Sequence, residues 1–325
     1  MTSHPPNPTI EPSRRLASGR LRRTRSWPIA VAVLVSACGS APPSPTVSPA
    51  TSPTATPPAA LEGLLVATEA GIHVTDSVGF LVPFSQPDAL PISVSAGRRS
   101  VVAVDATGGV WLSSDPGSEP RSWRMLDLPS VEEPSVRLAA ISPDGATLAM
   151  AEGDLQGRAF DLVLHDILSG DRRTLAIARG LDGPPIWLGN DLVAVHTLGP
   201  DQRSAMTTLD VASFSAGRES VGYSIAAKAD GATVAFDDPV SGTIRVGSRA
   251  DWLAARLDGM AHVPNDAGGA VTELSMDADG SWLAIVRPTD SGTVIELLAR
   301  RAANWDSVHV IPLSTDGPVS IAWLR

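Results

Sequence analysis

The chain has 325 residues, a formal net charge of −10 and a single cysteine. An acidic balance argues against a nucleic-acid-binding protein and against direct adhesion to anionic lipid, because both surfaces repel negative charge. One cysteine cannot form a disulfide within the chain, so the folded part must be stabilised by its hydrophobic core.

The first 37 residues are organised like a secretory signal peptide. Six arginines precede an eleven-residue apolar run from Trp27 to Ala37. That run is too short to cross a bilayer, which needs about 20 apolar residues. A basic segment, a short apolar segment and small residues before a cleavage point define an export signal. We therefore predict that residues 1–37 are a signal peptide of the general secretion route.

The single cysteine follows this signal directly. The segment Val35-Ser-Ala-Cys38-Gly39 resembles the lipobox of bacterial lipoproteins. In that family the cysteine thiol receives a diacylglyceryl group, and the chain is cut just before it. The resemblance implies that Cys38 carries the lipid and anchors the protein to the extracytoplasmic face of the cell membrane, or to an outer membrane where the cell has one. The alternative is an ordinary cleaved signal followed by an incidental cysteine.

A Pro/Ser/Thr-rich segment comes next and completes a predicted tether over residues 38–60. Proline and small polar residues favour an extended, semi-rigid chain of about 3.1 Å per residue, which here reaches roughly 60–70 Å. Removal of residues 1–37 takes away six arginines and one glutamate, so the net charge falls from −10 to −15.

Residues 61–325 repeat one short pattern: an apolar strand, a turn, and a second apolar strand with a central alanine. The clearest copies are residues 141–150, 227–236 and 276–285, each with an Asp-Gly pair in the turn. Asp-Gly supplies the positive φ angles of a tight turn, and uncharged strands are typical of strands packed on both faces. We expect neighbouring sheets to approach closely at the recurring alanines: Ala67, Ala103, Ala149, Ala194, Ala235 and Ala284.

Four strands in every 40–50 residues are typical of the blades of a β-propeller. The C-terminal residues 319–325 provide one strand without a partner, and residues 64–74 provide strands that lack a first strand. Their pairing would remove an open sheet edge. We predict an all-β, six-bladed propeller over residues 61–325, closed by the N- and C-terminal strands. Its blades would span residues 318–325 with 61–88, then 89–131, 132–180, 181–219, 220–265 and 266–317.

The copy at residues 142–149, Ser-Pro-Asp-Gly-Ala-Thr-Leu-Ala, resembles the WD40-like repeats of TolB-type propellers in bacterial periplasmic and surface proteins. Residues 109–117, followed by Trp123, are similar to an Asp-box hairpin, although the tryptophan comes three residues late. Asp-box propellers include sialidases, which use a tyrosine nucleophile and three arginines. The chain has one tyrosine, Tyr223, and lacks the arginine-containing start of that family, so we do not expect an enzyme.

We predict no cofactor and no metal site. The histidines of the mature chain stand apart in the sequence, at His73, His165, His196, His262 and His309. The pair His165-Asp166 is typical of a hydrolase triad only if a serine nucleophile accompanies it, and no nucleophile elbow is present. We expect the acidic pairs Asp277/Asp279 and Asp237/Asp238 to form hairpin turns rather than calcium sites.

Three tryptophans, Trp123, Trp252 and Trp305, stand among polar residues, and we expect them to be exposed in loops. Exposed aromatic residues anchor protein partners or stack on sugars, and Arg121 would add a guanidinium group beside Trp123. We predict a monomeric, lipid-anchored binding or scaffold protein with a protein partner. A carbohydrate-binding lipoprotein is the alternative, and a sialidase-like hydrolase is the third. The binding rim would carry the long connections 113–124, 199–203 and 249–266.

Overall fold

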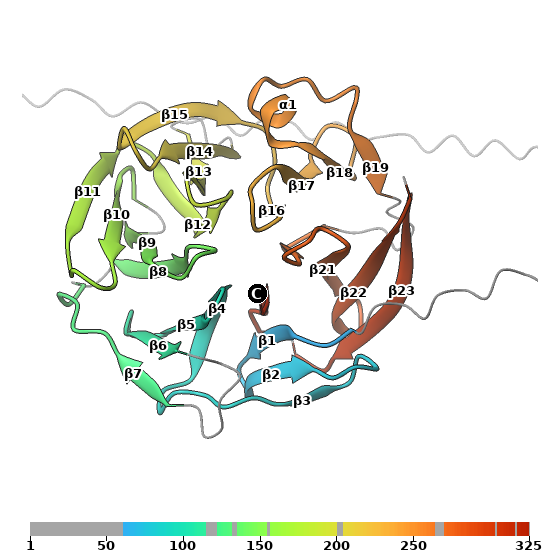
Figure 1. Cartoon of the computed structure of the whole chain (residues 1–325), viewed down its shortest axis with the longest axis horizontal. Coiled ribbons are helices and arrows are strands. Elements are labelled where there is room, and N and C mark those ends of the chain that lie inside the picture. Colours follow the sequence, from blue (N-terminus) through green and yellow to red (C-terminus); the bar gives the residue numbers. More distant parts are fainter. Residues whose placement is uncertain are drawn as a thin grey trace, which may run out of the picture. The chain divides into compact units, whose positions relative to one another are not determined.

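The computed structural model describes residues 61–114, 122–131, 135–154, 157–199, 204–263, 270–302, 304–315 and 317–324. In these residues, 24 strands form six four-stranded antiparallel sheets arranged as blades around one axis (Figure 1). The predicted all-β, six-bladed propeller is therefore confirmed. Helices are nearly absent, and no helix in the described part of the chain is long and apolar enough to cross a membrane.

The four strands of each blade follow one another from the axis of the ring to its outer edge. In that order, blade 1 consists of β24 (Ser320–Trp323), β1 (Leu64–Thr68), β2 (Gly71–Thr75) and β3 (Leu81–Pro83). Blade 2 consists of β4 (Pro91–Gly97), β5 (Ser100–Asp105), β6 (Val110–Ser114) and β7 (Trp123–Met125). Blade 3 consists of β8 (Val136–Ile141), β9 (Thr147–Gly153), β10 (Phe160–Asp166) and β11 (Arg172–Ile177). Blade 4 consists of β12 (Gly180–Trp187), β13 (Leu192–Leu198), β14 (Ser204–Asp210) and β15 (Ser215–Ser220). Blade 5 consists of β16 (Ile225–Ala227), β17 (Thr233–Asp238), β18 (Thr243–Ser248) and β19 (Ala261–Val263). Blade 6 consists of β20 (Glu273–Met276), β21 (Trp282–Thr289), β22 (Gly292–Arg301) and β23 (Asn304–Leu313). These strands fall within the predicted blades to within one residue.

The two ends of the described chain close the ring as predicted. Strand β24 pairs antiparallel with β1, with Leu64 opposite Trp323 and Ala67 opposite Ser320. The backbone N–H of Leu324 also donates to the carbonyl of Gly63 at 2.8 Å. Blade 1 is therefore built from both ends of the described chain, and its innermost strand is not left without a partner.

The hydrophobic core consists of six apolar layers, each lying between two adjacent blades. One layer, for example, joins Val102 and Leu112 of blade 2 to Leu148 and Met150 of blade 3. The recurring alanines all lie in the second strand of their blades and are buried, as expected from close packing of neighbouring sheets. A larger side chain at these positions would overpack the layer between the blades.

All innermost strands run in the same direction, so the ring has two different faces. We call the side where these strands begin the pocket face, and the side where they end, in the turns toward the second strands, the turn face. On the turn face, adjacent blades touch through their turns: Arg98 N–H donates to the carbonyl of Pro143 at 2.8 Å, and Asp144 N–H donates to Asn190 Oδ1 at 3.2 Å. These contacts fix the spacing of successive blades.

The Asp-Gly turns lie on the turn face. In each pair only the glycine takes a positive φ angle: +80° at Gly145, +69° at Gly231 and +76° at Gly280. The aspartate has a different role from the one predicted, because its carboxylate accepts a hydrogen bond from the backbone N–H two residues later, as Asp230 does from Ala232 at 2.8 Å. The pair is thus one Asx turn followed by one left-handed glycine.

Candidate functional site

A pocket of about 310 Å³ lies along the axis of the ring, lined by the innermost strands of all six blades. Its wall is mixed, with apolar residues such as Ile141, Leu274 and Ile321 among polar ones. Polar side chains gather where these strands begin, at the pocket face: Asp182, His196, Tyr223, Thr272 and Glu273. Among the described residues that line the pocket, none is lysine or arginine. The pocket therefore offers hydrogen-bond acceptors and hydroxyl groups, but no cationic side chain.

Asp182 of β12 lies beside His196 of β13, just before the pairing of these strands becomes irregular. The register pairs Gly180 with Leu198 and Leu181 with Thr197, so its next step places Asp182 opposite His196, and the register shifts only between there and Pro185. Asp182 Oδ2 lies 3.0 Å from Nδ1 of His196. The result is an Asp–His pair at the mouth of the pocket.

The environment of His196 keeps its imidazole neutral near pH 7. Burial lowers the pKa of His196, and the nearby carboxylate of Asp182 opposes this shift without reversing it. Contact with Asp182 favours the tautomer with its proton on Nδ1, which leaves Nε2 as an acceptor. This Nε2 atom is buried and has no hydrogen-bond partner among the described residues. An unsatisfied buried acceptor costs about 1–3 kcal/mol, so a donor that reaches it is favoured.

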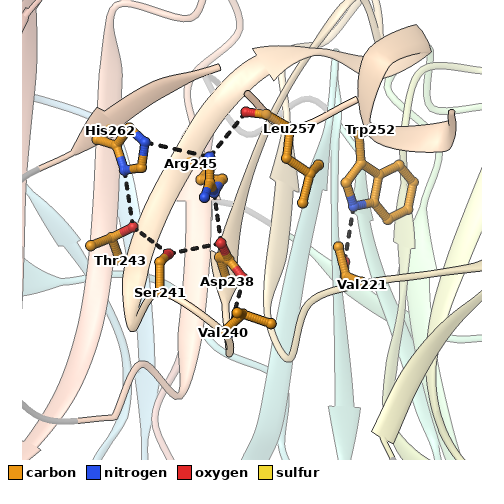
Figure 2. A network of polar contacts seen from close by, with 9 residues as sticks. All are labelled: Val221, Asp238, Val240, Ser241, Thr243, Arg245, Trp252, Leu257 and His262. Atoms are coloured by element: carbon orange, nitrogen blue, oxygen red, sulfur yellow. Dashed lines mark hydrogen bonds and ion pairs between the residues drawn. The ribbon is translucent and has the colours of Figure 1, made fainter. Parts of the chain in front are cut away.

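Tyr223 stands beside His196 at the mouth of the pocket. Its ring meets the imidazole edge-on, with the centroids 6.0 Å apart, and the residue remains 46% exposed. It lies in the connection between β15 and β16, which two hydrogen bonds hold in place. Trp252 Nε1 donates to the carbonyl of Val221 at 2.9 Å (Figure 2), and Ser224 Oγ donates to the carbonyl of Thr272 at 3.1 Å. Tyr223 is thus presented to solvent from a fixed backbone.

The segment that carries Trp252 is itself held by a buried ion pair in blade 5 (Figure 2). Arg245 Nε donates to Asp238 Oδ2 at 2.6 Å, and Arg245 Nη1 donates to the carbonyl of Leu257 at 3.0 Å. Burial alone would raise the pKa of Asp238, but hydrogen bonds from Ser241 and Arg245 bring it below its ordinary value. The predicted turn at Asp238 is confirmed, because its carbonyl accepts a hydrogen bond from Gly242 N–H at 2.8 Å.

Glu273 links three blades at the wall of the pocket. Its Oε1 accepts hydrogen bonds from Ile321 N–H at 3.0 Å and from Ser320 Oγ at 3.2 Å, both on the closing strand β24. Ser320 Oγ in turn accepts from Val94 N–H of blade 2 at 3.2 Å. Burial raises the pKa of Glu273 to about 8, despite these two hydrogen bonds. Near pH 7 the carboxyl group is therefore mostly protonated and stabilises ring closure as a neutral group.

The structure corrects the expected exposure of two tryptophans. Trp252 is 1% exposed and Trp305 is 4% exposed, so neither is an exposed anchor for a partner. Trp252 lies on the buried side of α1 (Arg249–Leu253), and Trp305 points inward from β23 while its neighbours Asn304 and Asp306 point outward. Polar neighbours in a strand do not indicate exposure, because successive side chains point to opposite sides.

Trp123 is the one remaining predicted contact residue within the described part of the chain. It lies in β7, is half-buried, and donates from Nε1 to Ser85 Oγ at 2.9 Å. Arg121 and Cys38 lie outside the described residues, so the roles predicted for them stay predictions. His165 is buried in β10, and the Asp166 carboxylate accepts turn N–H groups from Leu168 and Ser169, so this pair is structural.

Sequence reasoning missed the Asp182–His196 contact. The two residues are fourteen positions apart, and the wide spacing of the histidines along the chain gives no hint of it. The contact follows from the register of β12 against β13, and no motif in the sequence marks that register. Tyr223 is exposed at the mouth of the pocket, whereas the sequence suggested only the role of a nucleophile for it.

No protein-family model and no curated protein matches this chain. Several solved propellers resemble it in structure. A chain of a nidogen/laminin complex matches with a TM-score of 0.55 and 11% identity, over 80% of this chain and 97% of that one. TolB of Acinetobacter baumannii matches with a TM-score of 0.47 and 13% identity, over 78% of this chain and 70% of that one. A Bacteroides uniformis protein named as a 6-phosphogluconolactonase matches with a TM-score of 0.48 and 14% identity, over 78% and 83%. At such low sequence identities, structural similarity shows that the chains share the propeller fold and shows nothing about a shared function.

Proposed function

We propose that this protein is an exported lipoprotein, anchored through Cys38, whose propeller binds a protein partner at the pocket face. The propeller fold is compatible with such a non-enzymatic role. The observation that carries the proposal is the mouth of the central pocket, where exposed apolar and aromatic side chains surround unsatisfied acceptors. Export and anchoring rest on the sequence of residues 1–39.

The mouth of the pocket has the composition of a protein-binding surface. Ile92 on blade 2 and Tyr223 next to blade 5 line the pocket and are exposed, and Leu90 and Val221 are exposed beside them in sequence. Tyrosine and large apolar side chains with few lysines are typical of the centres of protein interfaces. Such side chains would contact the partner around the pocket.

The polar groups of the pocket indicate which part of a partner would enter it. Nε2 of His196 lacks a donor, the carboxylate of Asp182 lies next to it, and no cationic side chain opposes them among the described lining residues. These groups favour a lysine or arginine side chain, which brings several N–H donors and a positive charge. An anionic ligand such as a sialic acid would find no guanidinium group here, which weighs against the sialidase-like alternative.

The proposal is tested by photo-crosslinking in cells from a benzoylphenylalanine placed at Ile92. We expect one dominant protein adduct, with the crosslinked peptide next to a lysine or arginine. The same group at Leu168, an exposed residue on a turn of blade 3, should give no such adduct. Adding Tyr223→Ala or Asp182→Asn to the Ile92 variant should reduce the adduct at least tenfold without lowering the melting temperature.

Two results would contradict this function. An adduct of equal yield from Ile92 and Leu168 would mean that the pocket face has no special role. Absence of a protein adduct, together with retention of the protein on cell-wall glycan, would favour the carbohydrate-binding alternative.

Anchoring is tested separately. Cys38→Ser should move the protein from the membrane fraction to the soluble extracytoplasmic fraction, because the acylated thiol is then absent. A membrane fraction unchanged by Cys38→Ser would show that Cys38 does not anchor the protein.

A further inference from the structure

The turn between β2 and β3 in blade 1 exposes large apolar side chains. Phe80 is 67% exposed and Val78 is 59% exposed, and Val82 follows on the same edge of the ring. Strand β3 is the outermost strand of its blade (Figure 1). Neighbouring exposed apolar side chains of this kind mark a contact surface. We call Val78, Phe80 and Val82 the blade-1 apolar edge.

This turn is held rigidly in its exposed form. Asp76 Oδ1 accepts hydrogen bonds from the N–H groups of Val78 at 3.0 Å and Phe80 at 2.9 Å. The backbone N–H of Asp76 donates to the carbonyl of Phe80 at 2.9 Å. Three hydrogen bonds therefore fix the backbone of the turn, and the apolar side chains remain in solvent unless something covers them.

The chain enters the propeller next to this edge. Thr75 Oγ1 donates to the carbonyl of Leu61 at 2.5 Å, and a side-chain atom of Leu61 lies 3.0 Å from the ideal Cβ position of Gly79. Leu61 precedes β1, which begins on the turn face, and the β2–β3 turn lies on the same face. The described chain therefore begins directly beside the turn that carries Val78 and Phe80.

We propose that the blade-1 apolar edge contacts the lipid bilayer to which Cys38 is anchored, so that the pocket face points away from the membrane. This inference rests on the proposed lipid anchor. A contact by three side chains is too small to hold a free protein on a membrane. The tether makes the contact intramolecular, which raises its effective concentration above that of a free protein. Valine and phenylalanine are suited to the boundary between headgroups and acyl chains.

The local charge indicates the kind of lipid surface. Residues 61–88 contain four acids, Glu62, Glu69, Asp76 and Asp88, and no lysine or arginine. Attraction to anionic headgroups is therefore absent from this edge, and the contact must be hydrophobic. We expect it to form on phosphatidylcholine and to weaken on phosphatidylglycerol.

A second copy of the chain is a less suitable occupant. The open side of β3 is only three residues long and ends in Pro83, which has no N–H group for a further strand. Addition of a strand from another molecule is therefore poorly supported at this edge.

The test uses the full-length lipidated chain in phosphatidylcholine vesicles that contain nitroxide-labelled lipid. Val78→Cys and Val240→Cys are each labelled with an environment-sensitive fluorophore. Val240 is the matched control, because it lies in the β17–β18 turn on the pocket face, is 90% exposed, and its N–H also donates to a turn aspartate, Asp238. We expect the lipid nitroxide to quench the label at position 78 at least threefold more than at position 240. Phe80→Asp should remove that difference.

Failure of the anchor and failure of the contact give different results. An acylated Cys38 does not react with the fluorophore, so labelling of the protein without an added cysteine would show that the anchor is absent. Equal quenching at positions 78 and 240 in vesicle-bound protein would overturn the membrane contact. A blue shift in the emission of the fluorophore at position 78 that persists without lipid and disappears on dilution would also overturn it. Such a shift would mean that a second copy of the protein, and not the bilayer, covers the blade-1 apolar edge.

Discussion

The turn face and the pocket face of this propeller are built on different rules. On the turn face, blades 3, 5 and 6 repeat the same Asp-Gly turn, and adjacent turns touch through backbone atoms. On the pocket face, three adjacent blades contribute different residues: Asp182 from blade 4, Tyr223 before blade 5 and Glu273 from blade 6. Repetition thus serves the spacing of blades, while variation between blades creates a surface that can recognise one ligand.

This difference separates residues that hold the ring from residues that, in the proposed function, meet a partner. Substitutions on the turn face should change the free energy of unfolding and leave binding intact in the folded protein. Substitutions at Asp182 or Tyr223 should reduce binding and leave the free energy of unfolding unchanged, because neither side chain is part of the core. Three substitutions, at Glu273, Gly231 and Gly242, test how far this separation holds.

Glu273 should be an exception to this separation. It lies on the wall of the pocket, yet its carboxyl group holds β24 and so contributes to the stability of the ring. The pKa of its carboxyl group is about 8 in the fold, compared with about 4.5 for an ordinary glutamate. Between these values the folded state binds more protons than the unfolded state, so stability falls as pH rises. The expected loss is roughly 1 kcal/mol for each pH unit, or about 3 kcal/mol from pH 5 to pH 8. Urea denaturation across that range measures it.

Glu273→Gln keeps the shape and the acceptor oxygen but does not titrate. The variant should match the wild type at pH 5 and exceed it at pH 8 by about 3 kcal/mol. The wild type and the variant must both be measured, because burial also raises the pKa of Asp277, to about 6. Ionisation of Asp277 therefore adds its own pH dependence to the stability of both proteins. Identical pH slopes in the two proteins would show that Glu273 ionises freely in the fold.

The features that the sequence predicts well are those that repeat. Blade number, ring closure and the glycine of each Asp-Gly turn follow from a period of 40–50 residues and from local backbone preference. A repeat averages over several copies, so a single misjudged residue does not change the result. The strand limits agree with this, because they deviate from the predicted blades by no more than one residue.

The pocket was not predictable in the same way, because its residues do not repeat. Asp182 meets His196 because β12 and β13 pair in a register that places the two residues side by side. The misjudged tryptophans show the same limit. Trp252 has polar neighbours in the sequence, but α1 packs it between blades 4 and 5, where it fixes the backbone next to Tyr223. Such roles depend on contacts between blades.

Gly231 and Gly242 in blade 5 sharpen the comparison of the two faces. They have nearly equal φ angles, +69° and +65°, so alanine meets the same backbone strain at both, about 1 kcal/mol. Their surroundings differ. A Cβ at Gly231 would lie 2.3 Å from the carbonyl oxygen of Leu188 in blade 4, whereas a Cβ at Gly242, on the pocket face, would meet nothing within 4 Å. Gly231→Ala should therefore destabilise the protein by about 1–3 kcal/mol more than Gly242→Ala, since overpacking adds to the strain.

Urea denaturation of the two variants at one pH measures this difference directly. The backbone strain cancels, so the difference reports only the close approach of the blade 4 and blade 5 turns. Equal destabilisation would mean that the turns separate at little cost, and that blade spacing is set by the apolar layers alone. A larger loss in Gly231→Ala, with the photo-crosslink from Ile92 retained in the folded fraction, would assign spacing to the turn face and recognition to the pocket face.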